Sequence, residues 1–206
     1  MNVADVAVLF AYGSLLVELV VFPIPSEAST WQLLASRDGD AAVGAALVAA
    51  RRRPTVAKAV VFAVPTILGV LAWLVPGLAL LWPALRECAR VPTDGTAAAA
   101  VAAIAIGRGL TFASVLQLRA ARRAGRPPTG LFAWTRNPGL VGMYVCFAGL
   151  VLASGLPLLW AALPFYAANM HGRVRLEEAH LQARLGDVWT RYSAAVPRYL
   201  PFPGLR

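Results

Sequence analysis

Long apolar stretches dominate the chain and predict membrane-spanning helices, because about 20 apolar residues suffice to cross a bilayer as a helix. The second stretch contains Pro65, Pro76 and Pro83. We interpret it as one tilted or kinked helix, with two short helices as the alternative. The fourth stretch is interrupted by Ser154-Gly155-Leu156-Pro157, which predicts a helical hairpin. The four stretches are residues 4–23, 58–85, 96–118 and 139–170.

This pattern predicts an all-α integral membrane protein with about five transmembrane helices. The last two form the hairpin, and a cytoplasmic amphipathic helix and a tail follow it. The composition agrees with this fold class, since 59% of the residues are hydrophobic and the mean hydropathy is +0.64. Only 14% are charged, against roughly a quarter in ordinary globular proteins.

The net charge of +9 comes mainly from arginines that flank the apolar stretches. The connections are alternately rich and poor in basic residues, which places the N-terminus outside and the tail in the cytoplasm. A sixth span would break this alternation. We expect no nucleic-acid partner, because no separate basic domain exists. Abundant Ala and Arg beside the single lysine, Lys58, are typical of a GC-rich bacterial genome, so we expect the membrane to be a bacterial inner (plasma) membrane.

Cysteine and histidine carry little chemical information here. Cys88 and Cys146 form neither a disulfide framework nor a redox motif. His171 and His180 lack metal-ligand spacing. Glu177 and His180 are three residues apart on one predicted helix, but no second pair of this kind exists. We therefore expect no metal.

Three polar segments follow residue 129, after a basic stretch that ends in Pro127-Pro128. In the first, Pro138 is suited to the first turn of a helix. Arg136 and Asn137 then precede a helix N-terminus, whose free N–H groups attract anions. An arginine beside them favours a carboxylate or a phosphate. An interfacial arginine anchor is the alternative interpretation.

The second segment spans residues 173–192 and predicts an amphipathic helix. Its apolar stripe consists of Val174, Leu181, Leu185, Val188 and Tyr192. Glu178 lies on this stripe and Glu177 borders it. Arg173 precedes Glu177 by four residues, within side-chain reach along a helix. The alternative is an ion-paired surface helix with a solvated Glu177. The third segment is Val196-Pro197-Arg198-Tyr199-Leu200-Pro201-Phe202, which suits either interfacial packing or ligand contact.

In this order, the segments resemble the isoprenylcysteine carboxyl methyltransferase and phospholipid methyltransferase superfamily. Its signature is R-H-P-x-Y-x-G, an apolar hairpin, a helix with paired glutamates, and a terminal V-x-R-x-x-P. Asn137 and Leu140 replace the usual His and Tyr. The matching positions are Arg136, Pro138, Gly142, Arg173, Glu177, Glu178, Leu181, Gly186, Trp189, Tyr192, Val196, Arg198 and Pro201.

The resemblance implies S-adenosylmethionine as cofactor, with residues 1–129 as transmembrane scaffold and acceptor-side region and residues 130–206 as the cofactor-binding part. The implied catalytic residues are Arg173 and Glu177. The acceptor is expected to be lipophilic: isoprenylcysteine-like, an isoprenoid or a phospholipid. An NADPH-dependent membrane reductase of the sterol reductase type and a non-catalytic scaffold are the alternatives. The implied cofactor-binding residues are Arg136, Asn137, Pro138, Leu140, Gly142, Glu177 and Glu178.

Two further ionisable residues, Glu18 and Arg108, lie inside predicted spans. Charged residues within a membrane are costly and usually paired or functional. We expect them either to pair with each other or to act at the acceptor site.

Overall fold

The computed structural model describes residues 3–21, 45–90, 92–124 and 128–199, and these contain helices but no strand. Two compact units divide the chain. Unit 1 comprises residues 1–23, 72–163 and 196–206, and unit 2 comprises residues 24–71 and 164–195. The elements are α1 (Val3–Val21), α3 (Ala45–Arg51), α4 (Thr55–Lys58), the π-helix η1 (Ala59–Ala63), α5 (Val64–Leu81), α6 (Pro83–Glu87), α7 (Asp94–Arg123), the 3₁₀-helix η2 (Gly130–Ala133), α8 (Pro138–Ser154), α9 (Leu159–Leu185) and α10 (Asp187–Ala195).

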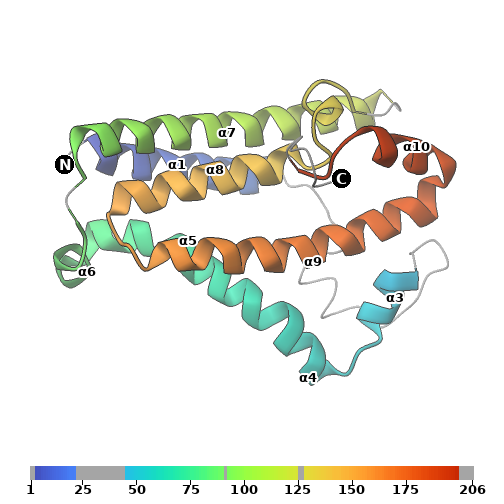
Figure 1. The fold of residues 1–206 in the computed structure, drawn as a ribbon, viewed down its shortest axis with the longest axis horizontal. Helices are drawn as coiled ribbons and strands as arrows, with labels where there is room; N and C mark the ends of the chain where they lie inside the picture. The colour runs from blue at the N-terminus through green and yellow to red at the C-terminus, as the bar shows by residue number, and fades with distance from the viewer. Residues whose placement is uncertain (1–2, 22–44, 91, 125–127, 200–206) are drawn as a thin grey trace. The chain divides into compact units, whose positions relative to one another are not determined.

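In unit 1, α1, α7 and α8 lie side by side (Figure 1). Glycines allow the backbones of α7 and α8 to approach closely, as is common between membrane helices. A Cβ added at Gly107 would lie 2.6 Å from the Gly142 carbonyl oxygen, and one at Gly149 would lie 2.8 Å from the Ile104 nitrogen. Phe147 and Leu150 of α8 are completely buried. This contact is the core of the unit.

The stretch predicted as one kinked helix at 58–85 is one helix, although it begins and ends earlier. It runs from Thr55 to Leu81 and includes the π-helix η1. A proline ring clashes with the carbonyl four residues before it. For Pro65, the residue four positions earlier lies within the π-helix. Pro76 remains within α5, and Pro83 starts the separate helix α6.

The hairpin break is confirmed at Gly155, which has a φ of +65° and follows the last residue of α8. Its carbonyl accepts a hydrogen bond from the Arg90 N–H at 2.8 Å. An added Cβ would collide with the Arg90 carbonyl, so this site requires glycine.

The prediction of a separate amphipathic helix after the hairpin was wrong. α9 continues without a break from Leu159 to Leu185, and the chain turns only at Gly186, with a φ of +53°. A residue in this left-handed conformation ends the helix, and α10 then takes a new direction. The predicted stripe is therefore interrupted: Val174 is buried, whereas Leu185 and Val188 are exposed.

Among the described residues, two helices are long and apolar enough to cross a membrane, Thr55–Leu81 with 27 residues and Asp94–Ala121 with 28. Pro138–Ser154 is a shorter apolar helix. The outward side chains of α1 are also apolar, with Phe10, Leu16 and Val20 exposed. The all-α fold is thus confirmed for the described residues, whereas the count of five spans stays a prediction.

We predict that Gly107→Val lowers the free energy of unfolding by about 2–3 kcal/mol, because the new side chain would meet the backbone of α8. Gly109→Val is the matched control on the same helix, where an added Cβ meets nothing within 4 Å. Unfolding in detergent with increasing denaturant measures both. Equal losses in the two variants would contradict the role of the close contact.

Candidate functional site

The predicted turn before α8 forms, and Pro138 occupies the first turn of the helix. Asn137 is the N-cap residue, but its side chain makes no capping hydrogen bond. Its Nδ2 instead donates to the Arg198 carbonyl oxygen at 3.0 Å. The first N–H groups of α8 therefore lack the usual side-chain acceptor, which leaves them suited to an anion.

The C-terminal tail is held against this turn through backbone carbonyls. The Arg136 N–H donates to the Pro197 carbonyl at 2.9 Å, and the Thr135 Oγ1 donates to the Arg198 carbonyl at 3.2 Å. The Tyr144 and Tyr199 rings meet edge to face, with centroids 6.5 Å apart. The structure thus brings together the first and third predicted segments. Pro201 of the third segment lies outside the described residues.

Leu140 and Gly142, two of the predicted cofactor-binding residues, are buried within unit 1. A Cβ at Gly142 would lie 2.6 Å from the Gly107 carbonyl oxygen and 2.7 Å from Thr111 Oγ1. The absence of a side chain at this position therefore serves the contact between α7 and α8. Cofactor binding by Leu140 and Gly142 stays a prediction.

The other predicted site residues, Arg173, Glu177 and Glu178, are partly buried on α9 in unit 2. Burial lowers the pKa of the Arg173 guanidinium, while Tyr166 and Glu177 act in the opposite direction. The expected proximity of Arg173 and Glu177 along the helix is thereby supported. His180, one turn beyond Glu177, is buried. This face of α9 thus carries the side chains of Arg173, Glu177 and His180.

Sequence reasoning missed a contact that residues 45–63 make with this part of α9. Leu176, which precedes Glu177, packs against a cluster containing Ala50 and Phe62. The Arg53 guanidinium lies over the Phe62 ring, 5.9 Å from its centroid. We had expected this segment only as part of the scaffold. Only the short apolar run of α3 indicated that it needs a packing partner.

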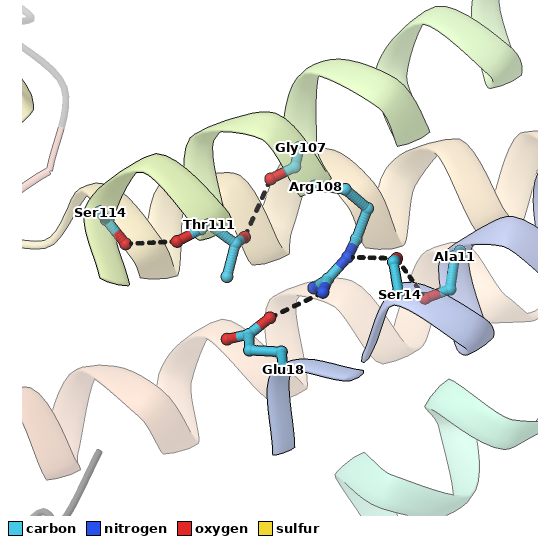
Figure 2. A network of polar contacts seen from close by, with 7 residues as sticks. All are labelled: Ala11, Ser14, Glu18, Gly107, Arg108, Thr111 and Ser114. Carbon is cyan, nitrogen blue, oxygen red and sulfur yellow. Dashed lines mark hydrogen bonds and ion pairs between the residues drawn. The ribbon is translucent and has the colours of Figure 1, made fainter. Parts of the chain in front are cut away.

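The predicted pairing of Glu18 and Arg108 is confirmed in unit 1 (Figure 2). Arg108 Nη2 donates to Glu18 Oε2 at 2.7 Å, and Arg108 Nε donates to Ser14 Oγ at 2.8 Å. The Ser14 hydroxyl in turn donates to the Ala11 carbonyl at 2.9 Å. The ring of Phe112 lies 5.0 Å from the guanidinium carbon. The contribution of Ser14 was not predicted, because serine is common in apolar helices.

The fold and these polar groups define an all-α protein with helices apolar enough for a membrane and a polar turn at the start of α8. Residues 96–187 match the family model described as phospholipid methyltransferase. The inferred resemblance is confirmed. The family indicates a membrane methyltransferase that acts on lipid-type substrates. No curated protein and no solved structure matches the chain.

We predict that Asn137→Asp loosens the tail, because a carboxylate cannot donate to the Arg198 carbonyl and repels it. Hydrogen exchange of the Arg136 amide, which is bonded to Pro197, should accelerate about tenfold, equivalent to about 1.4 kcal/mol. Thr190→Val serves as the control, because Thr190 makes exposed hydrogen bonds within unit 2. Unchanged exchange at Arg136 in Asn137→Asp would contradict the anchoring.

We also predict that Glu18→Gln lowers the free energy of unfolding by about 3–5 kcal/mol, because it leaves the buried Arg108 charge without its counterion. The matched control is Asp5→Asn, whose partner Arg86 is 54% exposed, and it should cost about 1 kcal/mol or less. Denaturant titration in detergent compares the two variants. A smaller loss for Glu18→Gln than for Asp5→Asn would contradict this assignment.

Proposed function

We propose that this chain is an S-adenosylmethionine-dependent methyltransferase of the bacterial inner membrane that methylates a lipophilic acceptor. In this proposal it has five spans, an external N-terminus and a site that faces the cytoplasm. The family match supports the reaction class. The matched residues 96–187 include Arg136, Asn137, Glu177 and Glu178, which are the groups suited to the cofactor.

The observation that carries the proposal is the turn at Arg136 and Asn137, which is fixed by the tail and opens α8. A helix start next to a guanidinium suits the amino-acid carboxylate of S-adenosylmethionine. The cofactor also carries an ammonium group and ribose hydroxyls, and the carboxylates of Glu177 and Glu178 suit these. When bound, it supplies a methyl group activated by a sulfonium.

The residues of the chain would act mainly by binding and orientation, which can account for much of a transfer reaction's rate. Arg173 is partly buried and shares a face of α9 with Glu177, four residues later, so it can orient a polar group of the acceptor. If the acceptor loses a proton on methylation, Glu177 can accept that proton at a carboxylate oxygen.

We predict that Arg136→Gln and Glu178→Gln each weaken S-adenosylmethionine binding at least tenfold, because each removes a charge-assisted hydrogen bond worth about 1.5–3 kcal/mol. Calorimetry in detergent measures the affinity. Arg184→Gln is the control, since Arg184 is exposed near the end of the same helix as Glu178. Wild-type affinity in Glu178→Gln would refute its assignment.

The unfolding temperature of the same purified protein distinguishes the proposed function from its alternatives. Binding of S-adenosylmethionine raises the unfolding temperature of a methyltransferase by mass action. Protection by NADPH instead would indicate a reductase of the sterol reductase type. Protection by neither compound would favour a non-catalytic scaffold and contradict the proposal.

A further inference from the structure

The ion pair between Arg108 and Glu18 retains unused hydrogen-bonding capacity within unit 1. Arg108 is 1% exposed, and its Nε and Nη2 are occupied by Ser14 and Glu18 (Figure 2). Its Nη1 has no hydrogen-bond partner among the described residues. The Ser14 hydroxyl accepts from Nε and donates to the Ala11 carbonyl oxygen.

A buried guanidinium nitrogen without a hydrogen-bond partner is energetically unfavourable unless a ligand accepts its hydrogen bond. A buried charged donor without a partner loses its hydration with no replacement, and polar groups inside membranes commonly mark ligand sites. Glu18 Oε2 is bonded to Arg108, and the described residues offer no partner for Oε1. The Glu18 side chain is 17% exposed, and the exposed apolar Val21 lies one turn further along the same face of α1. A molecule dissolved in the bilayer can therefore reach the carboxylate.

The hydrogen-bonding groups left at Arg108 and Glu18 indicate which class of ligand can bind there. One donor at Arg108 and one acceptor at Glu18 complement a group that both accepts and donates a hydrogen bond, and a hydroxyl does both. A carboxylate or phosphate would accept from Arg108 but would be repelled by Glu18. An ammonium would bind Glu18 but be repelled by Arg108, and a carbonyl could not donate. A thiol is weaker in both roles.

We propose that Arg108 and Glu18 bind the hydroxyl group of a membrane-dissolved amphiphile. The Arg108 Nη1–H donates to the hydroxyl oxygen, and the hydroxyl donates to Glu18 Oε1. The apolar part of the amphiphile lies along the exposed apolar residues of α1. The assignment of this molecule as the methyl acceptor rests on the proposed function. In that role the hydroxyl oxygen would form a bond to the methyl carbon, the bond from that carbon to the sulfonium sulfur would break, S-adenosylhomocysteine would leave, and the hydroxyl proton would pass to Glu18 Oε1.

The location within unit 1 agrees with an acceptor role. Gly107, which precedes Arg108, contacts α8 at Gly142 and Cys146. Gly142 follows Pro138 by four residues, or about 6 Å along a helix. The pair thus lies roughly one to two turns along α8 from the proposed cofactor turn.

The test compares 4-dodecylphenol with dodecylbenzene and 4-dodecylanisole, which share the chain but lack the hydroxyl or its proton. Purified full-length protein in detergent is heated with each probe, without cofactor. We expect 4-dodecylphenol to raise the wild-type unfolding temperature about 5 °C more than either analogue. E18Q/R108Q should lose this difference, while D5N/R86Q, which removes the ion pair between Asp5 and Arg86, should keep it.

Equal shifts with all three probes in the wild type would overturn the hydroxyl site, even if E18Q/R108Q failed to fold. A phenol-selective shift that persists in folded E18Q/R108Q would overturn the assignment to these residues. Methyl-labelled S-adenosylmethionine then tests the acceptor role, which predicts labelled 4-dodecylanisole. Selective binding without labelled product would overturn that role alone, whereas absent cofactor binding by calorimetry would overturn the proposed function.

Discussion

The close contact between α7 and α8 is the constraint on which the structure of unit 1 depends. Gly107, Gly142 and Gly149 bring the two backbones so near that a single added Cβ would clash. Because α8 is fixed along α7, its first turn lies at a defined position along the α7 axis. Asn137 and Arg136 can therefore hold the tail there. The same contact places Arg108 on α7 opposite Glu18 of α1. Packing of small residues therefore positions both polar features of the unit.

These polar features differ in chemistry. The turn offers N–H groups and a guanidinium at a helix start, which suits a carboxylate. The pair of Arg108 and Glu18 is neutral as a whole and offers one donor and one acceptor, which suits a hydroxyl. A methyltransferase of the proposed kind needs one binding site for the charged cofactor and another for an apolar acceptor that carries a polar group. Both requirements can be met by residues that the α7–α8 contact positions.

Much of this could be predicted from the sequence where a residue type has one dominant structural use. Gly155 and Pro157 predicted the hairpin break, Pro138 predicted the start of α8, and pairing was one of the two roles expected for Glu18 and Arg108. The continuity of α9 was missed, because the change from apolar to charged residues near Met170 was taken as a helix boundary. The true end is set by the conformation of Gly186. The hydrogen bonds from the turn to Pro197 and Arg198 could not be predicted, since their acceptors are backbone carbonyls, which every residue has.

The proposed function depends most on the binding of S-adenosylmethionine at the turn before α8. Ultraviolet crosslinking of the methyl-labelled cofactor to the full-length protein, followed by peptide mapping, tests it most directly. The account predicts label in peptides containing residues 130–142 and residues 173–180, displaced by unlabelled cofactor but not by NADPH. Label confined to other segments, or displaced equally by NADPH, would contradict it.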